Sequence, residues 1–225
     1  MNIPHVSKVN NWYIPEVYKN AKTLILGSFN PYNQDGKNAD YYYGRETNYF
    51  WRVIGHYLHS NENFYINNLD EKINIMLDKK FCFYDVIQSI DVISNDDDAL
   101  YKFVHQKIFI EFSDQVLFTT NTKYNIVPIS VFREYNQDVF ELLAIGNIEK
   151  VIHTMGNSRI KTNFDAKPNE RSLGINGFQG YLNQILKHNI SFQPISLSPS
   201  MREVRKGGDT YFNSLTNWLV QNLDL

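Results

Sequence analysis

The sequence predicts an α/β fold, a three-layer α/β/α sandwich built on a mostly parallel central sheet of about four strands. Two short apolar runs, Thr23–Leu26 and Val151–Thr154, each lead into a glycine within two residues. Such runs are typical of strands buried on both faces of a parallel sheet. Segments with helical spacing of apolar residues alternate with these strands, and that order favours an open α/β sheet.

The first predicted strand ends at Gly27 and Ser28, and the first long helix begins near Asn48, with Thr47 or Asn48 as its cap. The loop between them joins the end of a strand to the start of a helix. Crevices at such places are where open α/β sheets usually bind ligands. The apolar or aromatic positions of this helix are Phe50, Trp51, Ile54, Tyr57 and Leu58.

Further along the chain, apolar spacing predicts helices at Leu69–Leu77, Asp138–Ile145 and Phe178–Leu186, and another strand at Ile190–Ile195. A loop follows at Ser196–Ser200. Residues 109–131 carry mixed strand signals, which fit either an insertion or a pair of short strands. The chain closes with an amphipathic helix over Thr210–Leu223. Its inward positions are Phe212, Leu215, Trp218 and Leu219.

The bulk properties favour one large domain spanning residues 1–225, because 43% of the 225 residues are hydrophobic. With 22 basic and 24 acidic residues the net charge is -2, so any affinity for DNA must come from a local basic patch. The lone cysteine, Cys82, has no partner for an internal disulfide and cannot supply a cluster of thiolates. These features predict a cytoplasmic protein, which we expect to be a monomer.

No cofactor, membrane or metal is expected as a partner. The amino terminus lacks a basic stretch followed by an apolar run, and no apolar stretch is long enough to cross a membrane. His56 and His59 are three positions apart on a predicted helix, but no third metal ligand stands at matching spacing. We therefore predict no metal site.

The segment Ser28–Asn33 follows the first strand and contains Asn30 before Pro31. Proline restricts the preceding residue to extended geometry, which holds the Asn30 side chain out of the sheet, where an amide can orient a water molecule. The alternative is a simple turn. Three tyrosines at 41–43 follow, and at least one of their rings is expected to face the crevice and stack on a planar ligand. Packing over the neighbouring helix is the alternative for all three.

The stretch Gly27–Trp51 resembles the first motif region of the uracil-DNA glycosylase superfamily, and its hypoxanthine-DNA glycosylase branch most closely. That branch carries an LGS start and a YYxHPRNxFW continuation, and this chain reads YYGRETNYFW with the same spacing. The resemblance places Asn48 on the catalytic asparagine of the branch and Tyr43 on the aromatic residue that stacks on the extruded base. Ser28–Asn33 is similar to the GQDPYH and GINPG motifs of other branches, which places Asn30 on their catalytic residue.

The likeness continues in the segment FYDVIQS at 83–89, which is similar to the LWDVxxS stretch of the branch, and in Ser196–Met201, which stands where the second motif contacts DNA. Serine hydroxyls and backbone amides in such a loop can bind phosphate, and Met201 can fill the gap left by a flipped base. Two departures stand out, because Arg45-Glu46 replaces a His-Pro pair and residues 105–135 have no counterpart.

The resemblance implies a monofunctional DNA glycosylase that removes uracil or hypoxanthine after flipping it from the helix. No lysine lies in either motif, which argues against lyase chemistry through a Schiff base. Two alternatives stay open, namely excision of a hypermodified base from foreign DNA, and a catalytically inactive module that binds DNA or a protein partner.

The predicted site has three parts. Asn30 and Asn48 are the candidate catalytic residues, and which of them positions the water is open. His153, near the end of a strand, can either donate a hydrogen bond to the base or serve the structure, and the basic residues after Met201 can contact phosphate or form a solvated loop. The base-binding candidates are Ser28, Phe29, Tyr32, Tyr43 and His153, and the DNA-binding candidates are Ser196, Ser198, Pro199, Ser200, Met201, Arg202, Arg205 and Lys206.

Overall fold

The computed structural model describes residues 1–34, 36, 38–105, 129–155, 178–193 and 195–225. Its centre is a parallel sheet in the order β3-β2-β6-β7. All residues of two neighbouring apolar strands, β2 and β3, are buried, as expected for strands covered on both faces. The predicted α/β class and the parallel sheet of four strands are therefore confirmed. The strands are β2 Thr23–Gly27, β3 Phe81–Asp85, β6 Lys150–His153 and β7 Ser191–Phe192.

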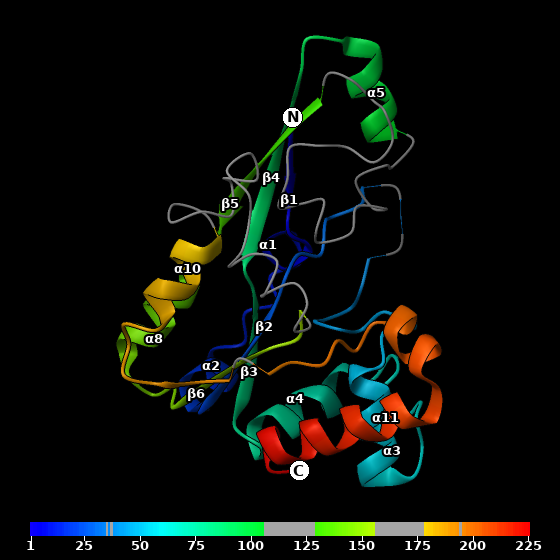
Figure 1. Ribbon diagram of the computed structural model, residues 1–225, viewed down its shortest axis with the longest axis vertical. Coiled ribbons are helices and arrows are strands. Elements are labelled where there is room, and N and C mark those ends of the chain that lie inside the picture. The colour runs from blue at the N-terminus through cyan, green and yellow to red at the C-terminus, as the bar shows by residue number, and fades with distance from the viewer. Residues whose placement is uncertain (35, 37, 106–128, 156–177, 194) are drawn as a thin grey trace.

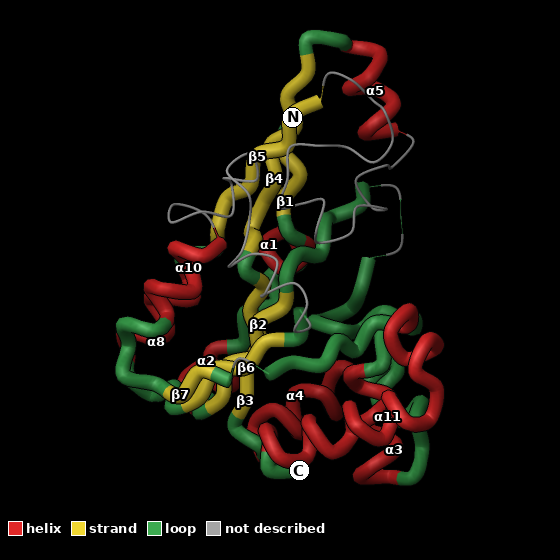
Figure 2. Tube along the Cα trace, in the orientation of Figure 1, coloured by secondary structure: helices red, strands yellow, loops and turns green. Residues whose placement is uncertain are grey.

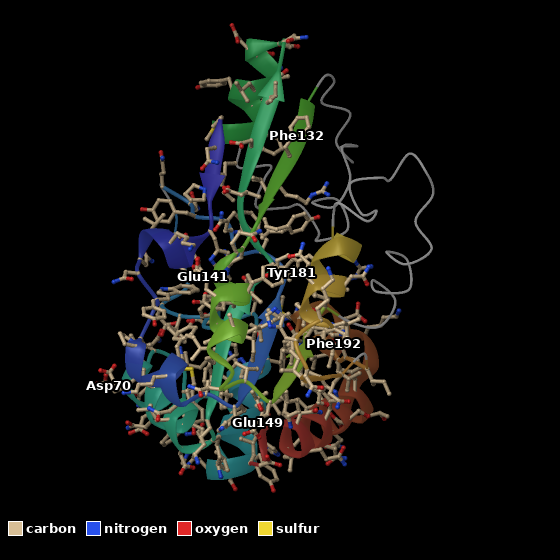
Figure 3. All side chains as sticks on the ribbon, turned by 90° about the vertical axis from the view of Figure 1, so that its left-hand side faces the viewer. Asp70, Phe132, Glu141, Glu149, Tyr181 and Phe192 are labelled. Carbon is tan, nitrogen blue, oxygen red and sulfur yellow. The ribbon has the colours of Figure 1, made fainter. Side chains whose placement is uncertain are left out.

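A second sheet, antiparallel and in the order β1-β4-β5, was not predicted. It consists of β1 (Asn2–Pro4), β4 (Ile87–Ser94) and β5 (Ile129–Tyr135). The chain passes from β3 into β4 through Val86 alone, so β4 continues the line of the parallel sheet and then leaves it (Figure 1). Part of this sheet is open to solvent, since Phe132 on β5 is exposed (Figure 3).

Helices cover both faces of the parallel sheet, with α3 and α11 on one side and α8 and α10 on the other (Figures 1 and 2). On the second side, buried Tyr181 packs on Phe140 with ring centroids 4.7 Å apart and donates its hydroxyl to the Asn136 carbonyl (Figure 3). No helix among the described residues is long and apolar enough to span a membrane. The helices are α1 Val6–Val9, α2 Pro15–Asn20, α3 Phe50–His59, α4 Leu69–Asp78, α5 Asp97–His105, α8 Asp138–Ile145, α10 Phe178–Ile185 and α11 Met201–Leu223.

The predicted helices α4, α8 and α10 end within one residue of their predicted limits, whereas three other predictions need correction. The strand predicted at Ile190–Ile195 is only two residues long. Helix α11 begins at Met201 rather than Thr210, so the basic segment predicted as a loop is helical. It continues across Gly208, whose φ of 56° kinks the helix. Tyr57, placed on the apolar stripe of α3, is exposed.

An aromatic core joins β3 to α3 and fixes the loop between β2 and α3. Phe83 is fully buried and stacks on Tyr42 with centroids 5.5 Å apart. Trp51, also buried, donates its indole N–H to the Tyr42 carbonyl at 2.8 Å, so the helix start and the tyrosine segment are tied together. This packing determines where the tyrosine rings and the preceding loop lie relative to the sheet. The mixed segment at 109–131 falls almost entirely outside the described residues.

Candidate functional site

A cavity of about 380 Å³ lies beyond the carboxyl ends of the parallel strands. Parallel pairing places Gly27 of β2 opposite Asp85 of β3, and Leu26 opposite His153 of β6, so the three strands end side by side. This is the edge at which open α/β sheets bind ligands. The cavity is lined by Gly27, Ser28, Phe29, Asn30, Tyr42, Tyr43, Arg45, Thr47, Asn48, Asp85, Thr154, Met155, Ser198, Pro199, Ser200 and Met201.

The loop after β2 is held by the amino-terminal segment of the chain. The Val6 amide donates to the Asn30 carbonyl at 2.9 Å, and the Tyr32 amide donates to the Pro4 carbonyl at 2.9 Å. His5 and Pro31 form an isolated antiparallel bridge between these contacts. Because the backbone is fixed on both sides of Asn30, its side chain has a defined direction at the cavity wall.

Arg45, which interrupts the expected motif, lies in the cavity wall and contacts Asn30. Its Nη2 donates to Asn30 Oδ1 at 2.6 Å, and because a guanidinium can only donate, the Asn30 amide must turn its oxygen toward Arg45. The Nδ2 group of Asn30 is then the donor left for a ligand. Burial lowers the pKa of Arg45, and its Nε has no hydrogen-bond partner among the residues described.

The two motif regions of the sequence meet at Asn48. Its side-chain Oδ1 accepts from the Phe50 amide at 2.9 Å and so satisfies the first amide of α3, although the N-cap of the helix is Tyr49 rather than the predicted Thr47 or Asn48. Its backbone forms an isolated antiparallel bridge with Ser200, and the neighbouring Tyr49 amide donates to the Pro199 carbonyl at 2.8 Å. Segments about 150 positions apart in the chain therefore form one continuous wall of the cavity.

Tyr42 and Tyr43 of the 41–43 run both line the cavity, and Tyr43 is the less buried of the two. Its backbone has a φ of 57°, a strained conformation for this residue type. The ring stacks on Phe50 with centroids 4.9 Å apart, and the hydroxyl shares a 2.6 Å hydrogen bond with Thr154 Oγ1. Burial, together with the nearby Asp85 carboxylate, raises the pKa of Tyr43, which keeps the hydroxyl protonated.

Asp85 is the functional candidate that sequence reasoning did not single out. It ends β3, is 7% exposed, and places Oδ2 2.6 Å from His5 Nε2. Its Oδ1 occupies the space above Gly27, where a Cβ added to the glycine would come within 2.0 Å of that oxygen. A charged residue directly after the run FCFY was the available signal, because an acidic residue at the end of a buried strand faces the ligand edge of the sheet.

Several predicted residues lie away from the cavity. His153 is fully buried with its ring stacked on Phe192 at 5.8 Å, and Ser196 is also buried, so neither presents a surface to a base or to DNA. Tyr32 packs partly buried against the core and does not line the cavity. Gly156 and Asn157, expected beside His153, lie outside the described residues.

The loop of the second motif is anchored to α11 and leads into its first turn. Tyr211 accepts from the Ser198 amide and donates to the Ser198 carbonyl, both at 2.9 Å. Ser200 caps α11 without a side-chain hydrogen bond, so the first amides of this helix keep no side-chain partner at the cap. Following it, Arg202, Arg205 and Lys206 are exposed on the first half of the helix.

No group of three or more histidine, cysteine, aspartate or glutamate side chains suited to a metal ion is found among the described residues. Comparison of the chain with known protein families, with curated proteins and with solved structures gave no match in any of the three.

Proposed function

We propose that this protein is a monofunctional DNA glycosylase that hydrolyses the bond between deoxyribose and a deaminated base, uracil or hypoxanthine. The observation that carries the proposal is the bridge between Asn48 and Ser200, which unites the two glycosylase-like segments around one cavity. The cavity also lies where an extruded base can enter, at the ligand edge of the sheet.

The polar groups of the cavity suit the charges that develop in this reaction. When the glycosidic bond breaks, negative charge accumulates on the departing base and positive charge on the sugar. With their oxygens engaged by Arg45 and by the Phe50 amide, Asn30 and Asn48 have Nδ2 groups left to donate to the base. An asparagine amide does not titrate, so these residues act by orientation and hydrogen bonding.

Tyr43 supplies an aromatic surface whose position is fixed before any ligand arrives. Its hydroxyl is bonded to Thr154, and one face of its ring is packed on Phe50. A rigid aromatic ring can stack on a base without losing much conformational freedom on binding. We propose that Tyr43 packs against the extruded base at the cavity wall.

DNA contact is assigned to the Ser198–Ser200 loop and to the first turns of α11. The serines and the amides at the helix start offer donors to phosphate oxygens, and Met201 lines the cavity as an apolar wedge. Arg202, Arg205 and Lys206 follow, with Glu203 and Asp209 as the acidic residues in the same stretch. The local excess of positive charge is therefore small, and we expect moderate affinity for DNA with clear salt dependence.

The proposal includes a cytoplasmic monomer that needs no metal or cofactor. Hydrolysis of this bond requires a positioned water, donors to the base and stabilisation of the sugar, all of which amino-acid side chains can supply. Cys82 is buried in β3, where burial raises the pKa of its thiol. That thiol is therefore unsuited to act as a nucleophile.

The test is cleavage of labelled duplex and single-stranded oligonucleotides that contain uracil, hypoxanthine or a hypermodified cytosine, followed by alkali. We expect strand breaks at uracil or hypoxanthine, and loss of these breaks in Asn30→Ala and Asn48→Ala variants that melt as the parent does. Breaks only at the hypermodified base would replace the proposed substrate with the alternative one. Binding of DNA without any breaks would contradict the glycosylase assignment and favour an inactive binding module.

A further inference from the structure

We infer that Asp85 is the catalytic base that accepts a proton from the attacking water, and that His5 is the positioning residue that holds it. This inference rests on the proposed glycosylase function, and it replaces the expectation that an asparagine alone manages the water.

Among the residues lining this cavity, Asp85 is the single carboxylate. The two asparagines have their oxygens engaged by donors, and Arg45 can only donate. The Tyr43 hydroxyl and Thr154 are bonded to each other. Asp85 Oδ1 accepts no hydrogen bond from any described residue, whereas Oδ2 is held by His5. The free oxygen is thus the acceptor best suited to a water proton.

The contacts of His5 define which of its ring nitrogens carries the proton. The Ser7 amide donates to Nδ1 at 3.0 Å, and since a backbone N–H can only donate, Nδ1 must present a lone pair. The ring proton is therefore on Nε2, which points at Asp85 Oδ2 at 2.6 Å. His5 is 2% exposed and lies parallel to Tyr42 with centroids 5.9 Å apart, so its ring cannot turn away.

Gly27 leaves room for the carboxylate at the end of β2. A Cβ on Gly27 would lie 2.0 Å from Asp85 Oδ1 and 2.8 Å from the Tyr43 hydroxyl oxygen. The missing side chain therefore lets the carboxylate reach over the strand end beside the predicted base-stacking ring. A water bonded to Oδ1 would stand in the cavity between these groups and next to the sugar of an extruded nucleotide.

In the proposed step, the water oxygen forms a bond to C1′ of the sugar while the bond from C1′ to the base nitrogen breaks. The electron pair of that bond leaves with the base, and one water proton passes to Asp85 Oδ1. The proton then returns to the anionic base, directly or through solvent, which restores the carboxylate. Before the proton moves, the same negative charge stabilises the developing positive charge on the sugar.

The attraction between the Asp85 carboxylate and a positively charged sugar can be tested by binding alone, without turnover. We would measure binding of duplex DNA with a pyrrolidine abasic analogue, which is cationic near neutral pH, and with the neutral tetrahydrofuran analogue. The parent protein should prefer the cationic analogue, and Asp85→Asn should lose that preference by at least tenfold while keeping its affinity for the neutral one. Asp91→Asn, an exposed carboxylate variant on β4, serves as the matched control and should behave as the parent.

His5 is tested by rescue. His5→Gln keeps a donor that can reach Asp85 and should retain most of the preference for the cationic analogue. His5→Phe keeps a ring beside Tyr42 but has no donor, so it should lose that preference. In single-turnover cleavage, Asp85→Asn should slow the reaction by about 10²-fold or more, the usual contribution of a catalytic base.

An Asp85→Asn protein that keeps the parental preference and rate would overturn the assignment of Asp85 alone. If the parent binds neither analogue better than undamaged duplex, the glycosylase proposal itself fails. If His5→Gln and His5→Phe lose the preference for the cationic analogue equally, the positioning role of His5 is overturned.

Discussion

The guanidinium of Arg45 donates to the Asn30 side-chain oxygen at 2.6 Å, and this bond connects the two ends of the loop that follows β2. Asn30 lies near the start of this loop, after β2, whereas Arg45 lies near its end, before α3. In the sequence, Arg45 looks like a break in a glycosylase motif. In the structure it decides which way the Asn30 amide faces, so the departure from the motif becomes part of the site.

A double-mutant cycle measures this link. Arg45→Ala frees the Asn30 amide to rotate, so we expect this variant to cleave more slowly in a single turnover. Adding Asn30→Ala to Arg45→Ala should then slow cleavage much less than Asn30→Ala alone does. The coupling energy between the two residues should be about 1 kcal/mol or more. Asn63→Ala provides the control, because it removes the exposed Asn63 Oδ1 acceptor of Arg52 Nη1, at 2.6 Å, and leaves the bond from Arg52 Nε to the Glu46 carbonyl in place. Asn63→Ala should leave cleavage unchanged, and additive effects at Arg45 and Asn30 would contradict the coupling.

Asn48 combines a structural and a chemical role that two substitutions separate. Its Oδ1 accepts from the Phe50 amide, so Asn48→Ala should lower the free energy of unfolding by about 1 kcal/mol through loss of this hydrogen bond. Asn48→Asp keeps an acceptor there and should melt as the parent does. Both variants lack the Nδ2 donor, so both should cleave about 10²-fold more slowly. Normal cleavage by Asn48→Asp would restrict Asn48 to a structural role.

The parallel sheet could be predicted because burial on both faces leaves a clear signal in the sequence. Thr23–Leu26 is an unbroken apolar run before a glycine, and the structure buries all of it. The antiparallel sheet leaves no comparable signal, since β4 mixes buried and exposed positions without strict alternation and follows β3 after a single residue. Helix α11 was placed too late because Gly207 and Gly208 look like a loop, although the helix continues through them with a kink.

The candidate site was predictable where residues follow a strand end or a helix start. Asn30, Tyr43 and Asn48 belong to a single loop, and all three line the cavity. The role of His5 depends on the pairing of β1 with β4, which brings the His5 side chain to Asp85 at the end of β3, and local sequence patterns do not reveal this contact. His153 was a base-binding candidate with a structural role as the alternative, and because a strand residue points to one of two faces, its ring here packs on Phe192.

Gly27 should be intolerant of any side chain. In Gly27→Ala the new Cβ would meet Asp85 Oδ1 at 2.0 Å, so the carboxylate must move, at a cost of about 1–3 kcal/mol in the free energy of unfolding. The cleavage rate of Gly27→Ala should fall by more than its loss of folded protein accounts for. Gly146→Ala is the control. Its φ of 82° should lower the free energy of unfolding by about 1 kcal/mol when alanine is introduced, although no atom lies within 4 Å of the new Cβ. Gly146→Ala should cleave normally, and equal activity of both variants would contradict the prediction.

Stability should fall steeply at alkaline pH. Burial raises the pKa of Tyr18, Tyr42 and Tyr43 above the ordinary value of 10.0, so in the folded state they stay protonated after the unfolded chain has begun to ionise. Their contribution is complete below about pH 10 and is lost as the pH rises, by about 1.4 kcal/mol per pH unit for each tyrosine. Urea unfolding between about pH 9 and pH 11 measures the slope.

Tyr43→Phe should reduce the slope of unfolding free energy against pH by the contribution of one tyrosine. Tyr57→Phe, at an exposed position, should not change this slope. Cys82, whose pKa burial also raises, contributes equally to both variants and cancels in the comparison. Identical slopes for the two variants would show that Tyr43 ionises as readily in the folded protein as in the unfolded chain. That result would contradict the protonated hydrogen bond to Thr154.

The basic side chains of α11 should determine how DNA binding depends on salt. Arg202, Arg205 and Lys206 are exposed and, within the described part of the chain, form no ion pair. Each one that contacts a phosphate contributes about 0.9 to the slope of log affinity against log salt, so each alanine variant should reduce the slope by that amount.

Fluorescence anisotropy with a tetrahydrofuran duplex measures this slope. Lys187→Ala, at an exposed position two residues after the end of α10, should leave the slope unchanged. These residues follow Met201 on α11 but do not line the cavity. The variants should therefore weaken binding to all duplexes alike, while the preference for the cationic analogue stays with Asp85. An unchanged slope in all three variants would move the phosphate contact away from α11.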